Sequence, residues 1–415
     1  MNARAHGGND LFIRDAAVLL GPELEFQPST NISIVGGKIS EIGAARRKGG
    51  QAVVTGKGLL VMPGLVNAHI HLNDAPLKDA GGGRSLEELI HPVTGLKKTG
   101  LSALGTEERV KRMSAAIDEM VRGGITSALD FHEEDISIIE RLREVNSNAE
   151  ILVVLGRPRR YFSQEEILSN RGFDKDETDA FIREQQKFDG TCLSGANEYS
   201  NRAMEQIGEV RKGLTGIHAA ESSATLERSL RMTGETEVER IAANLKPDFL
   251  VHMTSATESD IDIAAKSRYD IVCCPRSNAM FGVGTPPIPR LIESGFSIAL
   301  GSDNIMVNSP DMFREMDFAA RIARSSALDP LAVQAKEALR MATVNGEGLI
   351  ARSAGRGIVE GAKADLALMS MGSTRLSGTH YIYSALVHRA GPGDVLGTVK
   401  SGRLLFRRRE LSLEK

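Results

Sequence analysis

Short apolar runs alternate with polar and amphipathic stretches between about residue 60 and about residue 350 of the chain. Eight of these runs have the length and the flanking turn residues of buried β-strands. The expected strands are Leu65–His71, Ile125–Phe131, Ile151–Gly156, Thr191–Gly195, Leu214–Ala219, Phe249–Met253, Ile271–Cys274 and Ile298–Gly301. The stretches between them have room for helices, so the pattern predicts a repeated strand-then-helix unit.

A clear helix pattern lies between the first two expected strands. Apolar residues recur there at the spacing of a helix turn. They are Val110, Met113, Ile117, Met120 and Val121. Thr106 is the expected N-cap and Gly123-Gly124 the expected end. After the sixth strand, a capping box formed by Ser255 and Glu258 predicts the start of another helix.

Eight strand-then-helix units in one block predict a parallel sheet, and eight strands close a (β/α)8 TIM barrel. We therefore expect an α/β fold with a (β/α)8 TIM barrel. A doubly wound open sheet is the alternative, but such a sheet usually carries a glycine-rich phosphate loop. The chain contains no G-x-G-x-x-G pattern.

The two ends of the chain show short β-like runs with no helix pattern between them. The runs are Leu11–Phe26, Asn31–Ile42, Ala52–Val61, Ala364–Met369, Tyr381–Val387 and Gly397–Phe406. We expect residues 1–62 and 356–415 to form one small β-sandwich domain built from both termini. The barrel, residues 63–355, would then be inserted in it.

Composition and charge exclude several function classes. The formal net charge of the 415 residues is −3, which gives no electrostatic reason to expect nucleic acid or an anionic membrane as a partner. No apolar segment approaches the roughly 20 residues of a membrane helix, and the polar N-terminus has no signal-peptide core. Three cysteines without a Cys-x-x-Cys spacing are expected to pack in the core. These features predict a cytoplasmic protein in a reducing compartment.

His69 and His71 are the first candidates for chemistry. They stand two residues apart on an expected strand, so both side chains point to the same face of the sheet. Two neutral imidazoles that converge from one strand make half of a transition-metal site.

Further candidates follow other expected strands. His218 ends the fifth strand, with Glu221 three residues later; His252 ends the sixth strand, and Asp303 follows the eighth. Active sites of (β/α)8 barrels lie at the carboxyl ends of the strands. Four of the nine histidines stand at such ends, so we expect His69, His71, His218, His252, Glu221 and Asp303 to share one site.

These motifs resemble the amidohydrolase superfamily, and most closely its mononuclear aminohydrolase branch. The resemblance is carried, in the family's order, by Pro63–Leu72, His218–Glu221, His252, Cys274–Asn278 and Leu300–Asp303. That branch includes cytosine, guanine and S-adenosylhomocysteine deaminases and triazine chlorohydrolases.

The resemblance implies a role for each candidate. His69, His71, His218 and Asp303 match the ligands of one divalent metal ion, with Zn²⁺ expected and Fe²⁺ as the alternative. Glu221 matches the carboxylate that moves protons, His252 matches the residue that holds the attacking water, and Asp303 assists it. Binuclear relatives bridge two metals with a lysine on the fourth strand; because Lys187 lies before that strand, we expect a single ion.

The implied reaction is hydrolytic deamination of an aromatic N-heterocycle, a nucleobase or a nucleoside-like compound, with release of ammonia. A Zn²⁺ ion lowers the pKa of bound water to about 7 and so supplies the nucleophile. Two rivals keep the metal: ring opening of a cyclic amide, as in imidazolonepropionases, and hydrolytic dechlorination. A third rival is a catalytically inactive scaffold. Only deamination among these releases ammonia.

Residues at the other strand ends are expected to contact a small-molecule substrate. The candidates are His132, Asn197, Glu198, Ser277, Asn278 and Asn304. Arg157 and Arg159 could grip an anionic group, although arginines on loops are usually only solvated. The long segment Asn73–Gly100, which includes His91, is expected to be a lid or binding loop. The resemblance also implies a homo-oligomer.

Overall fold

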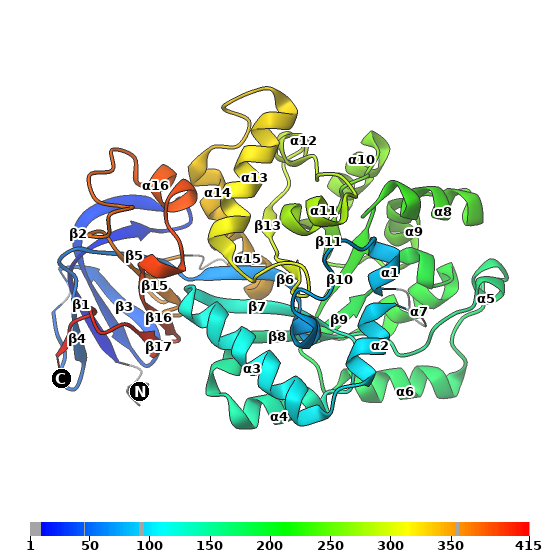
Figure 1. Ribbon diagram of the computed structural model, residues 1–415, viewed down its shortest axis with the longest axis horizontal. Helices are drawn as coiled ribbons and strands as arrows, with labels where there is room; N and C mark the ends of the chain where they lie inside the picture. Colours follow the sequence, from blue (N-terminus) through cyan, green and yellow to red (C-terminus); the bar gives the residue numbers. More distant parts are fainter. Residues whose placement is uncertain (1–9, 45, 91–94, 353–356, 415) are drawn as a thin grey trace.

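The computed structural model describes residues 10–44, 46–90, 95–352 and 357–414, and two sheets organise this part of the chain (Figure 1). The first sheet contains β1 (Leu11–Leu20), β2 (Glu25–Val35), β3 (Lys38–Gly43), β4 (Ala52–Thr55), β5 (Leu59–Pro63), β15 (Leu366–Ser370), β16 (Val395–Lys400), β17 (Arg403–Arg407) and β18 (Leu413–Glu414). The second contains β6 (Leu65–His71), β7 (Ile125–His132), β8 (Leu152–Gly156), β9 (Gly190–Leu193), β10 (Leu214–Ala219), β11 (Phe249–His252), β12 (Asp270–Cys273), β13 (Ile298–Leu300) and β14 (Asp303–Asn304).

The α-helices connect and cover the strands (Figure 1). They are α1 (Leu86–Ile90), α2 (Leu96–Ser102), α3 (Thr106–Arg122), α4 (Ser137–Val145), α5 (Gln164–Leu168), α6 (Lys175–Gln185), α7 (Asn201–Val210), α8 (Ser223–Thr233), α9 (Glu237–Asn244), α10 (Glu258–Ser267), α11 (Pro275–Phe281), α12 (Ile288–Glu293), α13 (Met312–Ala327), α14 (Ala335–Met341), α15 (Val344–Ala351) and α16 (Ile382–His388). The 3-10 helices are η1 (Leu72–Leu77), η2 (Ser147–Ile151), η3 (Ala196–Glu198) and η4 (Pro392–Asp394).

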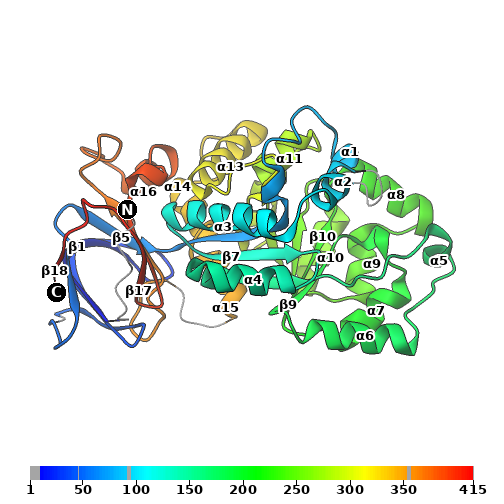
Figure 2. The ribbon, with the colours of Figure 1, turned by 60° about the horizontal axis from the view of Figure 1, so that its bottom comes forward.

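Strands from both ends of the chain share the first sheet, which lies to one side of the molecule (Figure 2). Its order is β17-β16-β15-β5-β1-β2-β3, with β4 paired to β1 and β18 paired to β4. The central junction is the antiparallel pair of β5 and β15. The expectation that strands from both ends of the chain meet in one sheet is therefore confirmed. The predicted boundary at residue 356 lies outside the described residues.

One terminal run was predicted wrongly. Tyr381–Val387 was expected to be a strand, but Ile382–His388 forms helix α16. Ile382, Ala385 and Leu386 are buried, a spacing that fits a helix face as well as an apolar run. Short apolar runs do not separate the two structures by periodicity alone.

The second sheet is parallel and curled, with the order β13-β12-β11-β10-β9-β8-β7-β6-β14 (Figure 2). The eight predicted strands are all present, and their ends differ from the prediction by at most two residues. β14, which pairs with β6, follows β13 after only Gly301 and Ser302. The hydrogen-bonded path through the described strands thus has nine members rather than the expected eight, because β14 is a further short strand beyond the predicted end at Gly301.

Two helix starts differ from the prediction. Thr106 is the first residue of α3, and Gly105 occupies the N-cap position. The capping box before α10 is formed by Thr257 and Asp260, not by Ser255 and Glu258. The Ser255 backbone N–H instead donates to the Ala220 carbonyl at 2.8 Å, which holds Ser255 in the preceding loop.

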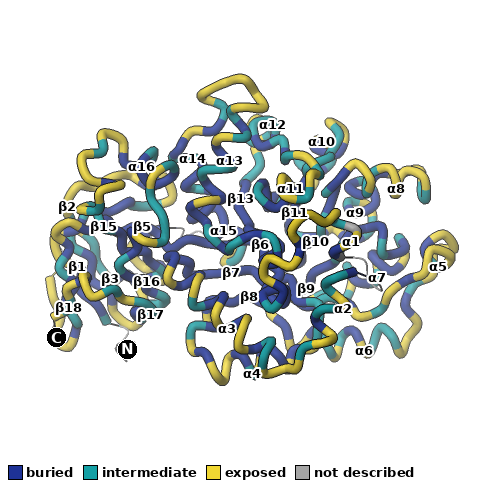
Figure 3. The backbone as a smooth tube through the Cα atoms, viewed as in Figure 1, coloured by how far each residue is buried: buried dark blue, intermediate teal, exposed yellow. Residues whose placement is uncertain are grey.

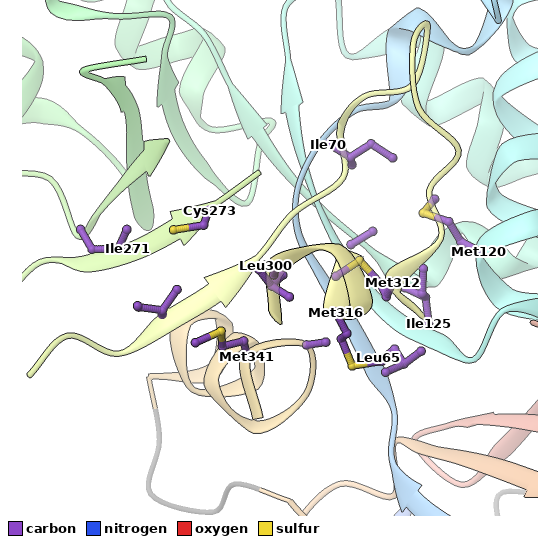
Figure 4. Packing of buried hydrophobic residues seen from close by; sticks show 14 of the residues in the cluster. Leu65, Ile70, Met120, Ile125, Ile271, Cys273, Leu300, Met312, Met316 and Met341 are labelled. Carbon is purple, nitrogen blue, oxygen red and sulfur yellow. The ribbon is translucent and has the colours of Figure 1, made fainter. Parts of the chain in front are cut away.

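Two apolar clusters pack on the two sides of the second sheet. The larger joins the strands to the surrounding helices; Figure 4 shows Leu65 and Leu300 beside Met312 and Met316 of α13. The smaller cluster fills the concave side and takes residues from most of the strands. Its members include Leu129, Leu155, Cys192, Val251, Val272 and Ala299. The strands therefore form the buried centre of this unit (Figure 3).

The three cysteines are free and buried, as predicted. Within the described ranges, no helix combines the length and the apolar character needed to span a membrane.

Candidate metal centre and active site

Six predicted site residues converge at the carboxyl ends of the strands. One ligand atom from each of His69, His71 and His218 lies within 4.8 Å of the others, and the same holds for His69, His252 and Asp303. His69 Nε2 lies 3.2 Å from both Asp303 Oδ1 and His218 Nε2. His69 is thus the centre of both groups.

A break in the alternation of β6 and one glycine place the first two imidazoles. Ala68 packs into the concave cluster and Ile70 into the outer one, and the pairing with β7 shifts register between Asn67 and Ile70. After this irregularity His69 and His71 flank Ile70 and point to the concave side of the sheet. Gly301 passes directly beside His69, where an added Cβ would lie 2.6 Å from the His69 Cβ. A larger residue at position 301 would therefore push the last strand away from β6.

A side-chain clamp fixes the last strand next to β6. The Asn67 amide donates to Ser302 Oγ at 2.7 Å, and the Ser302 backbone N–H donates to Asn67 Oδ1 at 2.9 Å. The clamp sets the position of Asp303, the next residue. Sequence reasoning missed both clamp residues.

Left-handed backbone conformations turn two further groups into the site. Val251 belongs to the concave cluster, so regular alternation would place His252 on the opposite face. His252 has a φ of 81° and Asp303 a φ of 58°. The His252 ring consequently stacks on the His218 ring at 5.1 Å. Such strained backbone is common at functional sites.

The imidazoles are held in their neutral form. Burial lowers the pKa of His69 and His218, and it lowers the pKa of His71 to about 3, helped by the charge of Lys97. His218 Nδ1 donates to the Ser194 carbonyl at 2.7 Å, so its Nε2 lone pair points toward His69.

Asp303 supplies a negative charge. Burial opposes its ionisation, but the hydrogen bond with His69 and the interaction with His252 hold the pKa of Asp303 well below its usual range. The Ser277 hydroxyl donates to Asp303 Oδ2 at 2.5 Å. Ser277 therefore orients the carboxylate from the start of α11.

His252 has a defined tautomer. The Asn278 amide nitrogen lies 3.1 Å from His252 Nδ1, and since an amide N–H only donates, Nδ1 accepts. The proton of the neutral ring is then on Nε2, which lies 3.9 Å from Glu221 Oε1. His252 is therefore placed to donate toward the space beside Glu221.

Glu221 is a carboxyl group suited to proton transfer. Burial raises the pKa of Glu221 to about 8, and the nearby Asp303 charge contributes to this rise. The residue follows Ala220, whose φ is 48° and whose N–H donates to Glu237 Oε2 at 3.2 Å. Glu237 on α9 thus supports the turn that presents Glu221.

A pocket opens over these groups. Among the predicted residues, it is lined by His71, Glu198, His218, Glu221, His252, Asp303 and Asn304. Four predicted substrate contacts do not line the pocket: Ser277, Asn278, His132 and Asn197. Ser277 is hydrogen-bonded to Asp303, and Asn278 to His252. His132 is buried against Asp130, at 3.3 Å, and Asn197 donates to the Thr225 carbonyl at 2.8 Å.

The segment after β6 contributes to the pocket wall. Within the described part of this segment, the lining residues are Leu86, Lys97 and Lys98, with Leu101 and Ser102 directly after it. His91 lies outside the described residues. Arg157 and Arg159 were the two arginines expected to be able to bind an anionic group of a substrate. Arg157 lines the pocket, whereas Arg159 is half exposed and pairs with Asp135 at 2.9 Å.

Sequence reasoning missed other lining residues, chiefly Lys97 and Glu133. Glu133 directly follows β7, so a strand-end rule applied to every strand would have found it. Lys97 stands 26 positions after His71 and lies in α2, so its sequence position gave no signal.

The residues present fit a Zn²⁺-like ion. Imidazole nitrogens and a carboxylate are common zinc ligands. His69 Nε2 and His218 Nε2 face each other at 3.2 Å, and a shared cation would satisfy both nitrogens together with the Asp303 charge.

Comparison with known proteins places the chain in context. The amidohydrolase family model matches residues 60–405. A putative aminohydrolase of Methanothermobacter thermautotrophicus is 34% identical over 96% of this chain and 100% of its own length. A 5′-deoxyadenosine deaminase of Methanosarcina mazei is 27% identical, covering 96% and 93% of the two chains. The crystal structure of an adenosine deaminase from Xanthomonas campestris with bound zinc superposes with a TM-score of 0.84, at 22% identity, over 97% of this chain and 94% of that one.

Proposed function

This chain belongs to the amidohydrolase family, and from that premise we propose that it is a zinc-dependent hydrolase that deaminates an adenosine-type nucleoside. The observation that carries the proposal is the convergence of His69, His71, His218 and Asp303 beside Glu221 in one pocket. The relatives named as aminohydrolase and 5′-deoxyadenosine deaminase support the reaction and the substrate class.

His69, His71, His218 and Asp303 would hold the ion. Zn²⁺ bound there would acidify water and so supply a nucleophile near neutral pH. The four side chains would offer three neutral imidazole nitrogens and one carboxylate, all of which are common zinc donors.

Glu221 would move the protons. Its raised pKa keeps the acid and base forms close in free energy near neutral pH, which is the condition for efficient proton transfer. Glu221 would take one proton from the attacking water and deliver it to the ring nitrogen beside the amino-bearing carbon of the purine. The second proton, on the hydroxyl that has been added to that carbon, would then pass to the amino group, so that the carbon–nitrogen bond breaks, ammonia leaves and a carbonyl remains. His252 Nε2–H would orient the water and, later, the new oxygen of the substrate.

The pocket walls suit a nucleoside. Most of its lining is polar or charged, and the apolar or aromatic residues in it are Leu86, Leu101, Tyr161 and Phe281. A nucleoside joins a flat base to a sugar rich in hydroxyl groups, so it suits such a mixed lining. We propose that these four residues contact the base, and that Glu198 and Asn304 contact its polar edge or the sugar.

Several finer statements belong to the same proposal. β13 and β14 would be the two halves of the last strand of a (β/α)8 barrel at residues 63–355, and residues 1–62 with 356–415 would form a sandwich domain. His132 and Asn197 would support the loops of the site rather than contact substrate. The cytoplasmic location, the homo-oligomer and the lack of nucleic-acid and membrane partners stay predictions.

Ammonia release tests the function. Zinc-loaded protein is incubated with adenosine, 5′-deoxyadenosine, adenosines with larger 5′ groups, guanine and an amino-triazine, and free ammonia is measured. Ammonia from the adenosine compounds supports the proposal. A cyclic amide or a chlorotriazine consumed without ammonia would favour the ring-opening or dechlorinating rival, and no turnover of any compound would favour the inactive scaffold.

A further inference from the structure

The three candidate imidazole ligands differ in what holds their second ring nitrogen. His218 Nδ1 donates to the Ser194 carbonyl at 2.7 Å. His71 Nε2 faces Asp303, and His71 Nδ1 faces Glu133 Oε1 at 3.6 Å. Histidines that bind zinc usually donate this second N–H to a carbonyl or carboxylate, which fixes the ring. Among the described residues, neither His69 Nδ1 nor His71 Nδ1 has a hydrogen-bond partner, and Glu133 is the carboxylate that lies next to His71 Nδ1, just beyond hydrogen-bond distance.

Two cations hold the Glu133 carboxylate in place. Lys97 Nζ lies 2.6 Å from Glu133 Oε2, and Arg157 Nη1 lies 3.5 Å from Glu133 Oε1. The three side chains are 12–19% exposed. The two cations therefore fix the position of the Glu133 carboxylate.

Arg157 also contacts Ser194, the residue that accepts the hydrogen bond from His218. Its Nη1 donates to Ser194 Oγ at 2.6 Å, and the carbonyl of the same Ser194 accepts from His218. The Arg157 guanidinium thus contacts both Glu133, which faces His71, and Ser194, which holds His218. Lys97, in the segment after β6, pairs with Asp74 of the same segment at 3.1 Å as well as with Glu133.

We propose that Glu133 is the positioning residue of His71, and that Arg157 and Lys97 hold its carboxylate toward His71 Nδ1. The inference rests on the proposed function, because it needs His71 to bind a metal ion. The carboxylate would fix the His71 tautomer and raise the basicity of Nε2, so its loss should weaken metal binding directly.

The test measures zinc affinity without substrate. Chelator-stripped full-length protein is titrated with Zn²⁺ in competition with a chromogenic chelator, and thermal melting of the stripped protein reports the fold. Glu133→Gln is expected to raise the zinc Kd about 10- to 100-fold. Arg157→Lys, which keeps the charge but loses the fork, is expected to raise it by a smaller factor.

Two matched variants serve as controls. Glu134→Gln alters the adjacent carboxylate, which pairs with Arg109 instead, and Arg159→Lys alters the half-exposed arginine of the same loop as Arg157. Both are expected to leave the zinc Kd within about twofold of wild type, since neither contacts a group behind a ligand.

Unchanged zinc affinity in Glu133→Gln and Arg157→Lys would overturn the inference. A raised KM for the nucleoside with unchanged zinc affinity would also overturn it, since Glu133 would then be a substrate contact. If Glu133→Gln does not fold, Arg157→Lys decides alone. Wild-type protein that binds no zinc would overturn the proposed function and this inference together, whereas zinc binding without deamination would overturn only the former.

Discussion

Replacing Glu221 by glutamine separates proton transfer from metal binding. Glu221 belongs to neither group of candidate ligands, and its Oε1 lies 3.9 Å from His252 Nε2. An amide of the same size keeps the shape of the pocket but carries no proton between water and substrate. Glu221→Gln should therefore keep its zinc and lose turnover.

The size of the loss follows from the role. A positioned general acid–base group contributes about 10²- to 10⁴-fold in rate, which corresponds to roughly 3–5 kcal/mol of transition-state stabilisation. With a pKa of about 8, the Glu221 carboxyl of the metal-free protein is about nine-tenths protonated at pH 7. The neutral amide should thus cost little stability.

The assay follows ammonia from the best nucleoside, with zinc content and melting temperature measured on the same sample. Glu198→Gln, which alters another lining carboxyl, is the matched control and should change KM more than kcat. Glu221→Gln protein with full zinc and a kcat within twofold of wild type would refute the proton-transfer role.

Two further predictions concern residues behind the site. Asn278→Ala removes the donor to His252 Nδ1 and should lower kcat about five- to tenfold with zinc content unchanged, since such a hydrogen bond is worth about 1 kcal/mol. Steady-state kinetics and zinc analysis of the variant check this prediction. An unchanged kcat would count against the tautomer assigned to His252. Burial raises the pKa of Glu237 from 4.5 to about 7. Between these two pH values the native state therefore binds more protons than the unfolded state, and the free energy of unfolding falls as the pH rises, by up to about 3 kcal/mol in total. Glu237→Gln should remove this loss, so denaturant titrations at pH 5 and pH 8 should differ less for the variant than for wild type; an equal difference would contradict the assignment.

Much of the fold could be predicted because strand alternation and apolar runs are local signals. β6 and β10 have the predicted bounds; each follows a glycine, Gly64 or Gly213, and is buried along its whole length apart from His218. The helix α16 was mistaken for a strand because its apolar run is short. β14 was not predicted, because it is a two-residue strand whose pairing with β6 joins residues that are far apart in the sequence.

The residues of the site also fall into those that local sequence signals predict and those that they do not. His69, His71, His218, His252, Glu221 and Asp303 lie at strand ends, so the parallel sheet brings them together. Ser277 and Asn278 were predicted as substrate contacts, but α11 places them behind Asp303 and His252. Lys97 reaches Glu133 only because η1 and α2 fold back over the strand ends. Tertiary packing of that kind leaves no periodic trace in the sequence.

Ammonia release by paired metal-free and zinc-loaded samples of the wild-type protein tests the central claim most directly. The account predicts about one zinc ion per chain and ammonia from an adenosine-type nucleoside, with release lost on chelation and restored by Zn²⁺. Protein that binds one zinc ion per chain and releases no ammonia from any aminopurine nucleoside would contradict it.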